Sequence, residues 1–291
     1  QVDLGWVFGR SGNTRQQSRH FENLIRSLED QTGMITALAD AFQRRGYNDY
    51  AIETFLHARR FPNRQRAFYS SLANLFERTG QFSLMMNEYL SYIEAFPDET
   101  GRIMGVLQDA IANDPGFARN EALRESLLSR AQLDPGNVLY SELLLWLSIQ
   151  QQDFRLAFMQ ARALDLRLRE DGFRVLEVGK MASANRQYNH AALAFKYVVD
   201  KGNNSPYYMD GLTGYLDVRF QEVISGYQTK SDELLEVEQA YRRALDELGV
   251  NASTVVLVRN LARLHAFYLG NRDTAAQLLN QTLAIPNVGA R

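Results

Sequence analysis

The chain has 291 residues, of which 45% are apolar and 23% charged, and its net charge is −2. This composition is typical of a folded protein and argues against a disordered chain or a domain that wraps nucleic acid. Because the chain has no Cys, disulfide frameworks, iron–sulfur clusters and Cys nucleophiles are excluded. Its 6 Pro are far below the average usage of about 5%, which favours long uninterrupted helices.

The first 30 residues divide into two segments. Residues 1–14 are Gly-rich without a helical period, so the sequence predicts an extended N-terminal arm. Arg15 to Asp30 carries apolar residues at helical spacing and predicts an amphipathic lead helix.

A pattern of four residues then recurs with a period of 34. It reads Leu38, Ala39, Phe42 and Gly46, and returns as Leu72, Ala73, Phe76 and Gly80. The same shift relates Phe154, Ala157 and Ala161 to Tyr188, Ala191 and Phe195. A fixed period of this length predicts helical repeats that bury their apolar faces by stacking.

The repeat resembles the tetratricopeptide repeat (TPR) family, in which small and aromatic residues occupy fixed positions of two helices. The resemblance implies an all-α, right-handed superhelical solenoid of about seven helix pairs after the N-terminal helix. The repeat domain is expected over 15–285, with 286–291 as a tail or a link to a further repeat. The pairs are expected at 33–60, 65–96, 99–132, 138–168, 171–201, 206–248 and 252–285.

Two pairs depart from the pattern. The pair at 99–132 lacks the aromatic signature, and the pair at 206–248 is about 15 residues too long. The excess near Val218–Glu233 predicts a loop, because Ser225–Gly226 and Thr229–Ser231 carry turn-forming residues.

The last predicted helix has an apolar stripe of Leu278, Leu279 and Leu283, part of which should point away from the preceding repeat. We expect either a further repeat after it or self-association through this face.

The sequence carries no pattern typical of catalysis or metal binding. The four His are never closer than 37 residues, which is not a zinc-ligand spacing. Gly9–Gly12 lacks the spacing of a phosphate-binding loop, and the carboxylate pairs are typical of solvated helix faces. The sequence therefore predicts no catalytic, cofactor-binding or metal-binding residue and no enzyme activity.

The TPR resemblance implies that the first helix of each pair lines a concave peptide-binding surface. The lining positions would be Thr36, Asp40, Gln43 and Arg44, followed by Ser70, Asn74, Glu77 and Arg78. Thr36 and Asp40 replace the Lys and Asn with which chaperone-binding TPR proteins begin a carboxylate clamp. Because Asp40 repels a carboxylate, recognition of an acidic chaperone tail is not expected. Further along, the lining would include Glu142, Trp146, Leu176, Lys180, Leu264, Phe267 and Tyr268, either as peptide anchors or as packing between repeats.

A basic cluster occupies the turn that follows the first predicted helix pair, 33–60. It contains Arg59, Arg60, Arg64 and Arg66. Arg binds carboxylates and phosphates with two hydrogen bonds, so an acidic peptide or a lipid headgroup could dock there. Alternatively, these charges simply complement the end of a helix dipole.

These observations favour a non-catalytic scaffold that binds a protein segment or subunit, without nucleic acid and without membrane insertion. The candidate partner-binding residues are Arg44, Asn74, Arg78, Arg60, Arg64, Arg66, Trp146 and Lys180. The alternative is a TPR segment of a larger enzyme or secretion component. A resemblance to long exported bacterial TPR proteins implies a periplasmic or otherwise exported location and a role in an envelope assembly; a cytoplasmic location is the alternative.

The repeat register makes a direct prediction about Ala191. If this small residue admits a bulky side chain of the neighbouring helix, Ala191→Leu should overpack the contact and cost about 1–3 kcal/mol of unfolding free energy. Thermal melts that match the parent protein would show that the register is wrong.

Overall fold

The computed structural model describes residues 1–225, 231–283 and 285. Over this part of the chain it contains sixteen α-helices, one short 3-10 helix (η1, Pro97–Glu99) and no strand, which confirms the all-α helical repeat. None of the helices described is both long and apolar enough to cross a membrane. The chain forms two compact units, Gln1–Pro135 and Gly136–Arg291.

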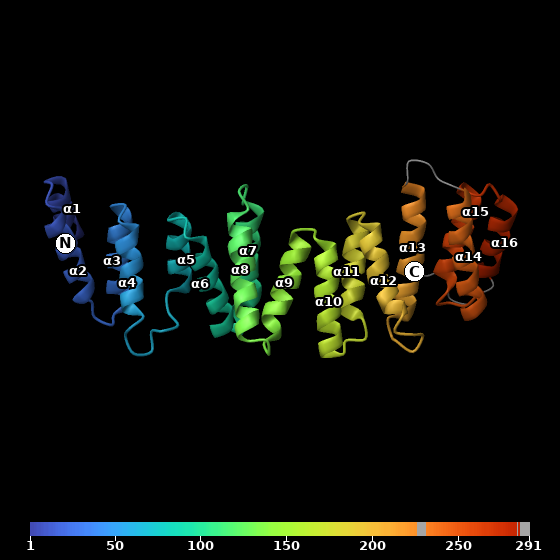
Figure 1. The fold of residues 1–291 in the computed structure, drawn as a ribbon, viewed down its shortest axis with the longest axis horizontal. Helices are drawn as coiled ribbons and strands as arrows, with labels where there is room; N and C mark the ends of the chain where they lie inside the picture. The colour runs from blue at the N-terminus through green and yellow to red at the C-terminus, as the bar shows by residue number, and fades with distance from the viewer. Residues whose placement is uncertain (226–230, 284, 286–291) are drawn as a thin grey trace. The chain divides into compact units, whose positions relative to one another are not determined.

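Unit 1 contains eight helices in four successive pairs (Figure 1). They are α1 (Val2–Arg10), α2 (Thr14–Arg26), α3 (Thr32–Arg44), α4 (Asn48–Ala58), α5 (Tyr69–Arg78), α6 (Phe82–Ala95), α7 (Thr100–Ala112) and α8 (Ala118–Leu133). The helices of the second, third and fourth pairs agree with the predicted ranges to within a few residues.

Unit 2 contains four further pairs (Figure 1). They are α9 (Val138–Gln150), α10 (Phe154–Leu168), α11 (Phe173–Ala184), α12 (Tyr188–Val199), α13 (Tyr208–Ser225), α14 (Ser231–Leu248), α15 (Val255–Phe267) and α16 (Arg272–Leu283).

The prediction of an extended arm over residues 1–14 is wrong, because Val2–Arg10 forms α1. The repeat pattern begins one period earlier than predicted, since Leu4, Gly5, Phe8 and Gly12 stand 34 residues before Leu38, Ala39, Phe42 and Gly46. A Cβ atom added to Gly5 would lie 2.1 Å from Cε1 of Phe21 on α2. Gly5 therefore serves close helix packing, and the described part of the chain has eight helix pairs instead of seven.

A small residue facing a large one holds the pairs together. Phe195 of α12 is 3% exposed, and its ring lies between Gly179 of α11 and Gly214 of α13. A Cβ atom added to these glycines would lie 2.9 Å and 2.7 Å from Phe195 Cε1, respectively. Ala191, one turn before Phe195, is fully buried as predicted. The aromatic side chain can be buried only because both neighbouring helices lack a side chain at the contact.

The two divergent pairs differ from the others for different reasons. In the fourth pair, the residues that stand 34 positions after Ala73 and Tyr89 are both large and buried: Leu107 on α7 and Leu123 on α8. Helix α8 packs mainly against α6. In the seventh pair the extra residues lengthen α13 and α14 to 18 residues each. The predicted loop is therefore largely helix, and its residues 226–230 lie outside the described residues.

At the last helix, Leu278 is 9% exposed, whereas Leu279 is 45% and Leu283 82% exposed. Part of the stripe thus points away from the preceding helix, as predicted. Self-association through it stays a prediction, and residues 286–291 lie outside the part of the chain that the structure describes.

Two Gly→Ala substitutions distinguish the effect of close packing on the unfolding free energy from the effect of helix propensity. Gly179→Ala should lower the unfolding free energy by about 1–3 kcal/mol, since the Phe195 ring cannot move away from α11 without approaching Gly214. Gly105→Ala is the matched control, because Gly105 also lies within a helix but has nothing within 4 Å of its added Cβ. It should raise stability by up to about 1 kcal/mol. Urea unfolding of both variants checks this, and equal effects would contradict the packing argument.

Candidate protein-binding surface

The first helices of the second and third pairs share an exposed polar face in unit 1. Three positions pair across the 34-residue period as Thr36 with Ser70, Asp40 with Asn74, and Arg44 with Arg78. Ser70 is half-buried and the other five are exposed. The Nη1 of Arg78 donates to Oε1 of Gln43 on α3 at 3.3 Å. The predicted residues Arg44, Asn74 and Arg78 therefore lie on one surface, named here the α3/α5 face.

A third arginine continues the row on α1. Arg10 stands 34 residues before Arg44, and Arg10, Arg44 and Arg78 are all exposed in the last turns of their helices. A cation at this position stabilises the helix end, which is its structural role. The row also leaves one exposed guanidinium on each of three successive repeats. Arg10 was not among the predicted binding residues because residues 1–14 were expected to form an arm, although the 34-residue spacing from Arg44 indicates its position.

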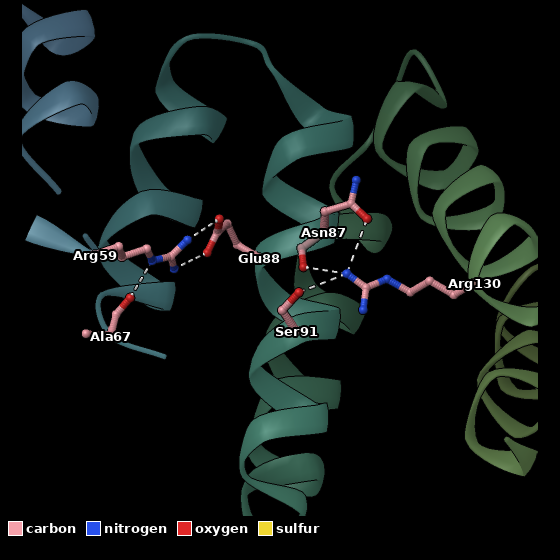
Figure 2. A network of polar contacts seen from close by, with 6 residues as sticks. All are labelled: Arg59, Ala67, Asn87, Glu88, Ser91 and Arg130. Atoms are coloured by element: carbon pink, nitrogen blue, oxygen red, sulfur yellow. Dashed lines mark hydrogen bonds and ion pairs between the residues drawn. The ribbon is translucent and has the colours of Figure 1, made fainter. Parts of the chain in front are cut away.

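The basic cluster between α4 and α5 divides into two kinds of residue. Arg59 is bound within the fold: its Nη1 donates to Glu88 of α6 at 2.8 Å and its Nε to the carbonyl of Ala67 at 2.8 Å (Figure 2). Arg64 donates to Asp30 and to Thr32, both at 2.7 Å. Arg60 and Arg66 are exposed. Two of the four cations are therefore structural, and two remain available to a partner.

Helix α6 also receives an arginine from its other side. Arg130 of α8 donates to Ser91 Oγ at 2.9 Å and to the carbonyl of Asn87 at 3.1 Å (Figure 2), and it pairs with Glu94. The side chains of Arg59 and Arg130 are each 17% exposed. These contacts tie α4 and α8 to α6, and they use the guanidinium groups for structure and not for a ligand.

In unit 2 some of the predicted lining residues are exposed and others are buried. Lys180 is exposed and pairs with Glu177 at 2.8 Å, and Trp146 is half-buried. Leu176 and Leu264 are 1% and 0% exposed, so their prediction as lining residues is wrong and the packing alternative holds. They lie on the core side of α11 and α15, where neighbouring helices cover them.

The remaining predicted lining residues also differ in their contacts and exposure. Glu142 pairs with Arg174 at 3.1 Å. Tyr268 packs edge-on against Phe220 with centroids 5.2 Å apart, whereas Phe267 is 78% exposed.

Helices α12, α13 and α14 border a hollow of about 280 Å³ that the sequence analysis did not predict. Leu212, Tyr215 and Leu216 line it together with charged residues that include Lys196 and Arg243. Its lining residues lie on three successive helices, and the 34-residue period gives no signal for such a hollow. Across the described residues no group of three or more His, Asp or Glu could hold a metal ion.

A buried carboxylate lies between α10 and α11. Asp165 is fully buried and accepts hydrogen bonds from Gly172 N at 2.6 Å and from Tyr197 Oη at 2.7 Å. It also pairs with Lys201 Nζ at 2.7 Å. Burial alone would raise the pKa of Asp165, but the bonds from Lys201, Tyr197 and Gly172 outweigh it and hold the pKa below its ordinary value. Every partner is internal, so this group fixes the turn between the two helices.

The chain was compared with family models, curated proteins and solved structures. No family model and no curated protein matches the chain. Solved structures that resemble it include the C-terminal part of a TPR repeat-containing protein from Cytophaga hutchinsonii, at 14% identity and a TM-score of 0.37, covering 100% of this chain and 97% of that one. Another is a tetratricopeptide repeat protein from Parabacteroides merdae, at 13% identity and a TM-score of 0.32, covering 91% and 93%. Scores of this size transfer no function. The chain's own spacing and helix pairs define it as a TPR-like helical repeat protein.

The Asp165 cluster predicts a pH-dependent stability. Because the folded-state pKa is lowered, the cluster stabilises the fold above the unfolded-state value of 3.8, and this is lost as pH falls through the folded-state pKa. Asp165→Asn should therefore cost about 3 kcal/mol at neutral pH, and its difference from the parent should shrink below about pH 4.

The control is Asp200→Asn, which removes an exposed pair with Lys196 and should change stability by less than about 1 kcal/mol. Urea unfolding at neutral and acidic pH measures both variants. A deficit for Asp165→Asn that is the same at both pH values would contradict the assignment.

Proposed function

We propose that the chain is a non-catalytic scaffold that binds an extended segment of another protein along the α3/α5 face. The observation that supports this most is the repetition of residue chemistry across the period: a hydroxyl, a carboxylate or amide, and an arginine recur on α3 and α5, and all of them except the half-buried Ser70 are exposed. Hydroxyl and amide groups can bond the backbone of an extended peptide, and each guanidinium can pair with an acidic side chain.

The charge distribution favours a particular kind of segment. Arg10, Arg44 and Arg78 place positive charge along the helix ends, whereas Asp40 places one negative charge near the middle of the α3/α5 face. A segment with spaced acidic side chains fits this row, and a terminal carboxylate placed at Asp40 does not. Exposed Arg60 and Arg66, and Trp146 and Lys180 of unit 2, stay predicted contributors.

The alternative function is that of a repeat segment within a larger enzyme or secretion component. The two can be told apart by whether the isolated chain retains a partner through the α3/α5 face. An exported location and a role in an envelope assembly stay predictions from the TPR resemblance.

The test is affinity purification of the tagged protein from its native host, comparing the parent with the triple variant Arg44→Gln, Asn74→Ala and Arg78→Gln. We expect recovery of the main partner to fall by about tenfold, because a loss of about 1.4 kcal/mol of binding free energy has this effect. Binding should also weaken at high salt, where the Debye length falls to about 3 Å.

The matched control carries Arg15→Gln and Arg19→Gln on α2, which remove two exposed charges outside the α3/α5 face. Partner recovery should be unchanged in this control. Equal recovery with the triple variant and the parent would refute the assignment of the α3/α5 face.

A further inference from the structure

The outward side of α10 in unit 2 carries a regular stripe that the proposed function does not use. The helix turns its buried residues Phe154, Ala157, Ala161 and Leu164 toward the core. The opposite side presents Arg155, Met159, Arg162 and Leu166, and Arg169 follows directly after the last helical residue; all five are exposed and stand alternately four and three residues apart in the sequence. These five residues are called the outer stripe.

Large apolar side chains are exposed along this side of α10. Met159 is 55% and Leu166 63% exposed, and they stand seven residues apart. Leu193 of α12 occupies the position of Met159 one repeat later and is 53% exposed. The Arg162 guanidinium lies over the Tyr197 ring of α12 at 5.6 Å, so the outer stripe borders that helix. Neighbouring exposed apolar residues framed by charges are typical of an interaction site.

The charge of the outer stripe is uncompensated within its own helix pair. Asp153 caps α10 by accepting a hydrogen bond from Leu156 N at 3.0 Å, and Asp165 is buried with Lys201. Glu170 pairs with Arg174 at 2.7 Å. Among the described residues, neither Arg155 nor Arg169 forms an ion pair. The acidic residues beside the stripe are thus already engaged, and its arginines face solvent.

We propose that the outer stripe, together with Leu193, docks an acidic amphipathic helix of a partner protein. Alternating spacings of three and four residues match the contact line of one helix lying along another, with Met159 and Leu166 one heptad apart. Carboxylates on the flanks of that helix would pair with Arg155, Arg162 and Arg169. A membrane surface fits less well, because α10 is fixed by its core side and offers only a narrow apolar line. The stripe lies in unit 2 and does not depend on the α3/α5 face.

The probe is a fluorescent peptide of about 21 residues, long enough to be helical, with Leu at alternating spacings of three and four and Glu on both flanks. A second peptide has Gln in place of every Glu. Fluorescence anisotropy should show the Glu peptide binding about tenfold more tightly than the Gln peptide. Binding should weaken by about tenfold in Arg155→Glu/Arg162→Glu and in Met159→Gln/Leu166→Gln.

The control is Leu56→Gln/Leu84→Gln, which removes two apolar residues of similar exposure, 41% and 45%, in unit 1 and should leave peptide binding unchanged. Melting temperatures close to that of the parent establish that the variants are folded. Equal binding of the two peptides, or binding that survives both double variants, would overturn the proposal. So would Arg155- and Arg162-dependent binding to phosphatidylglycerol vesicles without peptide binding, because it would assign the stripe to a membrane.

Discussion

The contact between a residue without a bulky side chain and an aromatic ring sixteen residues later is the constraint on which four of the eight described helix pairs depend. Gly5 faces Phe21 and Gly179 faces Phe195, at distances that leave no room for a Cβ atom. Ala39 with Phe55 and Ala73 with Tyr89 have the same spacing and are buried. In the pair formed by α9 and α10 the order is reversed: the large residue, Leu145, lies on the first helix and the small residue, Ala161, on the second. One small partner per contact brings the helix axes close, and the stacked pairs then share a core.

The arginines fall into two groups: some bind other residues of the fold, and others are exposed at helix ends. Arg130 fixes α8 to Ser91 and Glu94 of α6, and Arg59 binds Glu88 of the same helix. Such arginines have their hydrogen bonds satisfied inside the protein. The arginines at the ends of α1, α3 and α5 are exposed, and Arg78 also donates one hydrogen bond to Gln43. Binding by this protein is therefore expected to depend on residues that the fold itself does not require.

The sequence predicted much of the fold, because the 34-residue period directly reflects one helix pair. It failed at α1, where Gly5 was taken as a sign of flexibility although it serves close packing. It also failed at Leu176 and Leu264, since a lining position by family pattern need not be exposed when the next helix covers it. The roles of Arg59 and Arg64 depend on Glu88 and Asp30, residues about one repeat away. Such pairing is a property of the tertiary structure, and local sequence gives no signal for it.

The exposed α3/α5 face is the center of the functional account, and site-specific photo-crosslinking tests it most directly. A benzophenone amino acid placed at Asn74 in the protein expressed in its native host should, on irradiation, form one dominant adduct with another protein. The same amino acid at Ser18 on α2 should not form that adduct. Adducts of equal yield from both positions, or none from Asn74 while the partner still co-purifies, would contradict binding at this face.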